Sequence, residues 1–189
     1  MPEHRDRKNT WDLRYQTTGK LLPPESFLVN HLSWLKPGSV YDLACGIGGN
    51  SIVLSQHGFS VNSVDFSKVA LDTLNKTARA GSHSINTIEM DLTKERSFKS
   101  LTKADNIVVI HYKLENDLLN YIPSLLNNKG LFLYCTFNLR QSEHGKFPTI
   151  YCLKPEELVN KSWDLKLLKY DTFKNEKGHQ DGYLFQKLS

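Results

Sequence analysis

Apolar residues occur along the chain in short runs separated by polar turns, and the spacing of these runs alternates between that of strands and that of helices. Runs typical of strands lie at 39–44, 59–64, 85–90, 106–110 and 131–137. Helical spacing lies at 24–35, 50–57, from 67 onward, at 118–126 and at 156–160. Two further strands, at 165–173 and 182–187, flank a hairpin around Gly178.

Alternating strands and helices are typical of a parallel sheet covered by helices on both faces. The pattern therefore predicts a Rossmann-like, doubly wound α/β sheet of seven strands, mostly parallel, with a C-terminal antiparallel hairpin. The run Ile107 to Ile110 is continuously apolar, which predicts the central strand. Pro123 is expected to kink or split its helix, and the residues at 127–130 are expected to form a turn.

A glycine-rich turn follows the first predicted strand. Gly46, Gly48 and Gly49 lie between that strand and the helix predicted from Asn50. Glycine allows the backbone to turn sharply and to approach a ligand closely, and the following helix start directs N–H donors at it. Because Gly-x-Gly-Gly also occurs in ordinary tight turns, the surrounding residues have to decide whether this is a nucleotide-type site.

Three predicted strands end in a carboxylate at the same edge of the sheet: Asp42, Asp65 and Asp91. An acid at Asp42 suits a cationic ligand better than a pyrophosphate. Asp65 lies 65 − 46 = 19 residues after the first glycine, which fits a ribose-binding acid, and Asp91 suits an adenine amino group. Alternatively, each acid only forms a turn or caps a helix. Three such coincidences at one edge are less expected than one shared ligand.

The segment Asp42-Leu43-Ala44-Cys45-Gly46-Ile47-Gly48 resembles the first motif of the class I S-adenosylmethionine-dependent methyltransferases, acid-x-x-x-Gly-x-Gly. The likeness continues at Asn50, Val64-Asp65-Phe66-Ser67 and Met90-Asp91-Leu92. Within that superfamily, Trp11-Asp12-Leu13-Arg14-Tyr15, Thr136-Phe137 and the segment 153–158 are similar to the small bacterial branch around tellurite-resistance and thiopurine methyltransferases.

The resemblance implies S-adenosyl-L-methionine as the cofactor and a single methyltransferase domain over 1–189, with an N-terminal flap at 1–20 and a substrate-side loop at 138–150. Tyr15 or Arg14 of the flap is then expected near the methionyl carboxylate, although Trp11 packing on the domain edge is an equal alternative. The cofactor-binding residues expected are Trp11, Arg14, Tyr15, Asp42, Ala44, Cys45, Gly46, Gly48, Asn50, Asp65, Phe66, Asp91, Leu92 and His111.

Composition narrows the function classes. With 189 residues and 39% hydrophobic content, one full core is expected and a two-domain dehydrogenase is disfavoured. A Walker-type site is disfavoured because Gly-x4-Gly-Lys-Ser/Thr does not occur. A net charge of +4, with residues 1–10 polar, favours a solvated N-terminal tail over a nucleic-acid surface.

Neither a transmembrane run nor a signal-peptide core is apparent in the sequence, so a cytoplasmic protein is expected. Cys45, Cys135 and Cys152 match no zinc spacing, so buried reduced thiols are expected and no metal.

Candidate groups for the chemistry follow the fourth and fifth predicted strands. His111, Tyr112 and His144 are the candidates for a general base, and Tyr112, Arg140 and Lys146 for acceptor binding, although a structural role is equally open for each. A small-molecule acceptor is expected, with thiol or chalcogen compounds of the tellurite or selenite type as candidates. The alternatives are an RNA, DNA or protein methyltransferase, or a non-catalytic member that binds cofactor. Monomer and homodimer both remain open.

Overall fold

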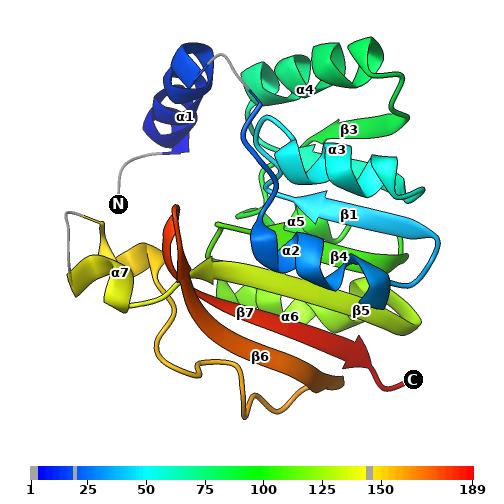
Figure 1. Cartoon of the computed structure of the whole chain (residues 1–189), viewed down its shortest axis with the longest axis vertical. Helices are drawn as coiled ribbons and strands as arrows, with labels where there is room; N and C mark the ends of the chain where they lie inside the picture. The colour runs from blue at the N-terminus through cyan, green and yellow to red at the C-terminus, as the bar shows by residue number, and fades with distance from the viewer. Residues whose placement is uncertain (1–3, 19–20, 144–146) are drawn as a thin grey trace.

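The computed structural model describes residues 4–18, 21–143 and 147–189. His144 and Lys146, two of the candidates from the sequence, lie outside these ranges. Seven strands form one sheet in the order β3-β2-β1-β4-β5-β7-β6 (Figure 1). The strands are β1 Ser39–Leu43, β2 Ser60–Asp65, β3 Ile85–Glu89, β4 Ala104–Ile110, β5 Leu126–Phe137, β6 Leu165–Asn175 and β7 Gly178–Lys187.

The first five strands are parallel, and β7 is antiparallel to both of its neighbours, β5 and β6. The predicted fold class is confirmed, as are the central position of β4 and the hairpin at Gly178, which has a φ of 129°. The strand order reverses between β1 and β4, because the chain leaves β1 toward β2 and β3 and then returns to β4 beside β1. In doubly wound sheets the ligand crevice opens at this point, outside the carboxyl ends of the strands.

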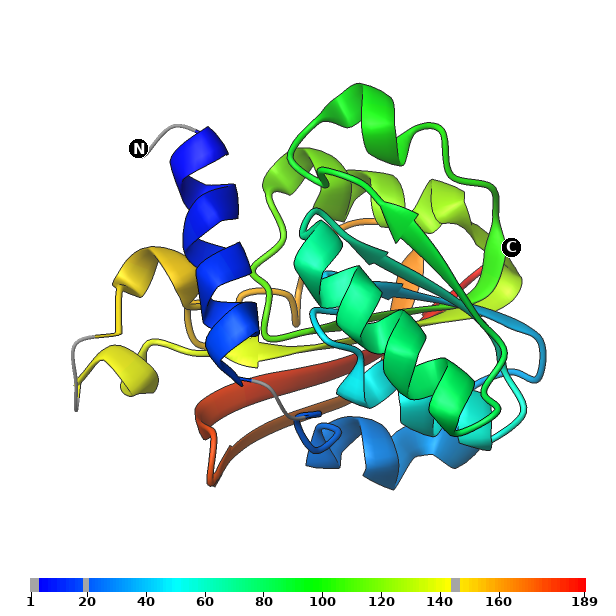
Figure 2. The same ribbon diagram turned by 90° about the horizontal axis from the view of Figure 1, so that it is seen from above.

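Helices cover both faces of the sheet (Figures 1 and 2). One face carries α2 Ser26–His31, α3 Gly49–Gln56 and α4 Lys68–Ala80, and the other carries α5 Glu95–Phe98 and α6 Asn116–Leu125. Successive residues of β4 point into different cores: Ile107 and Val109 pack with α6, while Val108 packs with α2 and α3. A strand buried on both faces accounts for the continuous apolar run in its sequence.

Pro123 does not split its helix: α6 runs through it to Leu125, and because this proline lies close to the helix end, few backbone hydrogen bonds are lost. Two other local predictions are wrong. The turn expected at 127–130 lies inside β5, where Lys129 has a φ of 60° and the register with β4 shifts. Residues 156–160 form turns and no α-helix.

The N-terminal helix, one more short α-helix and the 3-10 helices η1 Leu32–Trp34 and η2 Thr149–Tyr151 complete the described part of the fold. Residues His4–Thr18 form α1, and the predicted loop at 138–150 contains α7 Arg140–Glu143. The arrowheads of β1 and β5 point toward the side of the molecule on which α1 and α7 lie (Figures 1 and 2). Within the described ranges, no helix is long and apolar enough to span a membrane.

Candidate active site

The glycine turn after β1 has a strained, left-handed backbone. Ala44, Gly46 and Gly48 have φ angles of 58°, 54° and 87°, and the Gly48 N–H donates to the carbonyl oxygen of Cys45 at 3.0 Å. A Cβ at Gly48 would lie 2.2 Å from a methyl carbon of Leu74, so both conformation and space require glycine there. The turn leads directly into α3, which begins at Gly49, so the first backbone N–H groups of that helix lie next to the turn.

Asp65 ties the end of β2 to this turn. Its buried carboxylate accepts hydrogen bonds from the backbone N–H groups of Gly46, at 2.8 Å, and of Ser67, at 2.9 Å. Burial raises the pKa of Asp65 to about 6, although these two hydrogen bonds oppose the rise. Each carboxylate oxygen has a second acceptor position, so the group can still receive hydroxyl donors. The cap of α4 is Ser67, whose hydroxyl accepts from the N–H of Ala70, so Asp65 itself does not cap that helix.

Asp42 is buried at the end of β1 and is only half satisfied. Its Oδ2 accepts a hydrogen bond from the hydroxyl of Ser51 at 2.5 Å, and Ser51 in turn accepts one from Ser63 at 2.7 Å. Its Oδ1 is buried without a hydrogen-bond partner among the described residues. Burial, with a contribution from the charge of Asp65, raises the pKa of Asp42 to about 7 against the hydrogen bond from Ser51. An unpartnered buried carboxylate oxygen is a costly feature that a bound cation or donor would relieve.

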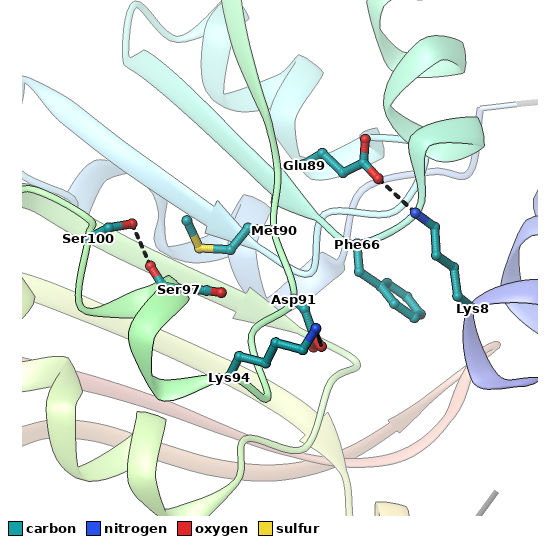
Figure 3. A pocket seen from close by; sticks show the side chains of 8 residues that line it. All are labelled: Lys8, Phe66, Glu89, Met90, Asp91, Lys94, Ser97 and Ser100. Atoms are coloured by element: carbon teal, nitrogen blue, oxygen red, sulfur yellow. Dashed lines mark hydrogen bonds and ion pairs between the residues drawn. The ribbon is translucent and has the colours of Figure 1, made fainter. Parts of the chain in front are cut away.

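A cavity of about 460 Å³ opens beside Asp91 at the ends of β2 and β3 (Figure 3). Asp91 Oδ1 accepts from the N–H and hydroxyl of Thr93, and Oδ2 lies 3.6 Å from Nζ of Lys94. Asp91 therefore also stabilises the turn that follows β3, as the alternative reading of the sequence expected. The cavity is lined by Lys8, Phe66, Glu89, Met90, Asp91, Lys94, Ser97 and Ser100.

The N-terminal helix α1 lies over the glycine turn and this cavity. Asp12 accepts a hydrogen bond from the hydroxyl of Ser67, and Lys8 Nζ lies 2.7 Å from an oxygen of Glu89. The Tyr15 ring lies against the turn, because a Cβ at Gly46 would come 3.0 Å from its hydroxyl. Burial, together with the charge of Asp65, raises the pKa of Tyr15. A solvated polar tail was expected up to residue 10, but helix α1 begins at His4. Because α1 contacts the rest of the domain through polar side chains, its sequence shows no apolar stripe.

Trp11 and Arg14 interact with each other on α1. The Arg14 guanidinium lies 4.8 Å from the Trp11 ring centroid, and Trp11 stacks on Tyr15 with the ring centroids 5.5 Å apart. Arg14 is exposed. The structure thus places Tyr15 directly on the glycine turn and Arg14 on the outer side of the same helix.

The end of β4 carries His111 in a left-handed conformation, with a φ of 55°. Its Nε2 lies 2.8 Å from Oε2 of Glu25 and 2.9 Å from Oε1 of Gln180, and its ring stacks on Phe137 with the centroids 4.9 Å apart. Glu25 and Gln180 carry no signal in the sequence, since neither belongs to a motif. Only the fold brings them to β4.

The other candidates occupy varied positions. Burial raises the pKa of Tyr112 to about 12, so its phenol stays protonated at neutral pH. Arg140 is exposed on α7. The side chain of Asn50 accepts a hydrogen bond from the Glu25 N–H at 2.9 Å and so fixes the segment before α2. Leu92 and Cys45 are buried in the core, and Cys135 and Cys152 are buried free thiols, as expected.

Solved structures with a similar fold include S-adenosylmethionine-dependent methyltransferases. TehB from Haemophilus influenzae superposes with a TM-score of 0.71 at 21% identity, over 86% of this chain and 62% of that one. An S-adenosylmethionine-dependent methyltransferase from Clostridium acetobutylicum ATCC 824 gives 0.67 at 16% identity, over 86% and 90% of the two chains. Magnesium protoporphyrin IX methyltransferase from Synechocystis PCC 6803, with bound SAM, gives 0.59 at 15% identity, over 97% and 79%.

These similarities establish the fold of the class I methyltransferases. The chain spans less than two thirds of the length of the Haemophilus TehB chain. A sequence comparison with curated proteins found no match. The model of the family described as "Tellurite resistance protein TehB" matches residues 6–173, which is most of the sequence, and the chain therefore belongs to the TehB family.

Proposed function

We propose that this protein is an S-adenosylmethionine-dependent methyltransferase that acts on a small molecule. The observation that carries the proposal is the meeting of Asp42, Asp65 and the glycine turn at the switch point of the sheet. Family membership supports it. A pyrophosphate would be repelled by the Asp42 carboxylate at this place, whereas a cationic nucleoside suits it.

The residues fit this cofactor part by part. Asp65 keeps acceptor positions for the ribose hydroxyls, and the unpartnered Oδ1 of Asp42 suits the positively charged methionyl end. The cavity beside Phe66, Met90 and Asp91 suits a planar base, with the Asp91 carboxylate as acceptor for its amino group. Tyr15, with Trp11 and Arg14 on the same helix, covers the site from above.

When bound, the cofactor supplies a methyl group already activated by a sulfonium charge. The chain's own contribution is then to position the donor and acceptor in line and to exclude water, which accounts for several kcal/mol of the barrier. The glycine turn and the acids beside it hold the methyl donor. Tyr112 and the described residues 138–143 and 147–150 follow β4 and β5 at their carboxyl ends, where the acceptor would approach.

The acceptor is proposed to be a small nucleophilic molecule held between α1 and the segment 138–150, with Tyr112, Arg140 and Lys146 as binding residues. A thiol or a chalcogen compound is the first candidate, because the family description names tellurite resistance. The net charge of +4 is modest for a nucleic-acid surface.

A methyl-transfer assay with labelled S-adenosylmethionine tests this function. Thiols, selenite, tellurite and small carboxylates form the acceptor panel, with total RNA as the rival substrate. Label transfer to a small acceptor, lost in Asp65→Ala, is expected. Transfer only to RNA, with affinity that falls steeply with salt, would contradict the small-molecule proposal.

A further inference from the structure

Glu25 is a fully buried carboxylate outside the predicted cofactor motifs. Its Oε1 accepts hydrogen bonds from the hydroxyl of Ser26, at 2.9 Å, and from the side-chain amide of Asn175, at 2.8 Å. Its Oε2 faces Nε2 of His111, at 2.8 Å, and Nζ of Lys177, at 3.5 Å. Burial pushes the pKa of Glu25 upward, but the contacts with His111, Ser26 and Lys177 outweigh it and lower the pKa to about 2. Glu25 is therefore ionised throughout the physiological range.

The surroundings of His111 determine which ring nitrogen carries the proton. Nε2 faces two acceptors, the Glu25 carboxylate and Oε1 of Gln180. The orientation of the Gln180 amide is fixed, because its nitrogen donates to Asn175 at 2.9 Å and its oxygen accepts from the thiol of Cys135 at 3.2 Å. A lone pair on Nε2 would be repelled by both oxygens, so Nε2 keeps its proton. Nδ1 is then the nitrogen at which a proton is gained or lost.

His111 lies beside the glycine turn. In the pairing of β1 with β4, Leu43 is opposite Val109; Gly46 is three residues beyond Leu43, and His111 is two residues beyond Val109. The two therefore flank the crevice at the switch point. The imidazole is partly accessible, with 26% of its side-chain surface exposed. Its positive φ of 55° is uncommon for histidine and is maintained by the surrounding contacts.

We propose that Glu25 and His111 form a proton-accepting dyad for the methyl acceptor, so that this site methylates a nucleophile that arrives with its proton. His111 is the base, through Nδ1, and Glu25 is a positioning residue that fixes the tautomer and balances the charge. The proposal rests on the proposed function and narrows its acceptor class. It favours an S–H, O–H or N–H compound over an oxyanion such as selenite.

The step balances as follows in atoms and charge. The lone pair of the nucleophile forms the bond to the methyl carbon, while the carbon–sulfur bond breaks and its electron pair stays on sulfur, which becomes neutral. The proton of the nucleophile passes to Nδ1 of His111, and the positive charge passes with it. Glu25 offsets the imidazolium charge until the proton is released to water. General-base assistance of this kind contributes about 10²- to 10⁴-fold in rate.

The binding of two cofactor forms tests the position of His111 without an acceptor. S-adenosylmethionine is a sulfonium cation and S-adenosylhomocysteine is neutral at sulfur, so a protonated His111 beside the methyl group weakens only the former. Calorimetry from pH 8 to pH 5.5 gives the dissociation constant of S-adenosylmethionine divided by that of S-adenosylhomocysteine. This ratio is expected to rise by about threefold or more in the wild type as the pH falls. Changes at Asp65 act on the ribose, which both ligands share, and leave the ratio unaffected.

Variants isolate the imidazole from the other groups around it. The His111 ring is faced by Glu25 from the segment before α2, by Gln180 from β7 and by Phe137 from β5. Behind them, Lys177 of the β6–β7 hairpin lies against Glu25, and the Cys135 thiol of β5 donates to Gln180. Burial raises the pKa of the Cys135 thiol, so it stays neutral. In His111→Gln the His111 part of the rise disappears, and any remaining slope belongs to Asp42. Glu25→Gln removes the carboxylate that faces Nε2 and is expected to lower kcat while the KM for the cofactor stays unchanged. His57 is an exposed histidine directly after α3. The control variant His57→Gln should leave the pH dependence of the ratio as it is in the wild type.

A turnover measurement with 2-mercaptoethanol as acceptor, an alkyl thiol that is protonated at neutral pH, adds the second readout. His111→Gln is expected to lower kcat by about 100-fold or more, with the KM for the cofactor unchanged. If both cofactor forms bind and the ratio has the same pH dependence in wild type and His111→Gln, the dyad is wrong. Selenite methylation that is undiminished in His111→Gln, with 2-mercaptoethanol inert, would also overturn it. If neither cofactor form binds, the proposed function itself fails.

Discussion

The carboxylate of Asp65 and the backbone N–H of Gly46 are joined by a hydrogen bond of 2.8 Å, although 19 residues separate them in the sequence. This bond fixes the distance between the end of β2 and the glycine turn. The acid is thereby held where a ribose bound over the turn would present its hydroxyl groups. One side chain would therefore couple cofactor binding to the geometry of the turn.

Replacing Asp65 with alanine is expected to weaken binding of S-adenosylhomocysteine by about 1.5 to 3 kcal/mol, or roughly ten- to a hundredfold, since hydrogen bonds to a charged group are lost. Asp91→Ala should cost less, because its carboxylate would meet one neutral amino group. Calorimetry on both variants measures the difference. Equal affinities of wild type and folded Asp65→Ala would show that Asp65 only shapes the turn.

The stability of the free protein should depend on pH through Asp42. Burial raises its folded-state pKa to about 7, above the ordinary value of 3.8. Between these values the folded state binds the proton and the unfolded state does not, so stability falls as pH rises from about 4 to 7. Asp65 adds to this trend up to about pH 6.

The variant Asp42→Asn isolates the contribution of Asp42. Urea unfolding at several pH values should give a shallower loss of stability for this variant than for the wild type, because the amide does not ionise. An unchanged slope would mean that the Asp42 carboxyl is not protonated in the free protein.

Gly48→Ala should destabilise the fold through a steric clash. The added Cβ would lie 2.2 Å from a methyl carbon of Leu74, at a φ of 87°. Gly58→Ala is the matched control, because Gly58 has a similar φ of 82° but open space around the added Cβ. The control should cost about 1 to 2 kcal/mol for backbone strain, and Gly48→Ala about 1 to 3 kcal/mol more for overpacking. Equal urea midpoints for the two variants would rule out the clash.

The helix α1 is expected to contribute to cofactor binding and not to the stability of the fold. Deleting residues 1–20 should leave the circular dichroism spectrum of the remaining sheet intact while cofactor affinity and turnover fall. Asp12→Ala, which removes the contact with Ser67, should weaken affinity in the same direction. Leu13→Ala, on the exposed face of α1 at 62% exposure, is the matched control. Unchanged affinity in the deletion would assign α1 a different role.

The strands of the sheet and the position of the three acids at its edge could be predicted from the sequence. Asp42, Asp65 and Asp91 were placed correctly at the ends of their strands, because strand periodicity also defines where each strand stops. The residues at 127–130 have the composition of a turn, but they lie within β5, where the register with β4 shifts and Lys129 has a positive φ. Local composition does not reveal such an extension of a strand.

Contacts between residues far apart in the sequence could not be predicted from the hydrophobic pattern. Glu25 and His111 are 111 − 25 = 86 residues apart, and neither belongs to a periodic stretch that predicts the other. The helix α1 was also missed, because it docks through Lys8, Asp12 and Tyr15 and therefore lacks an apolar stripe. Polar docking leaves no hydrophobic period for a sequence to show.

Calorimetric titration of the purified protein with S-adenosylhomocysteine, and separately with NADH, tests the central claim most directly. The acid at Asp42 predicts saturable one-to-one binding of the first ligand and none of the second. Binding of NADH by folded protein that does not bind S-adenosylhomocysteine or S-adenosylmethionine would contradict the account.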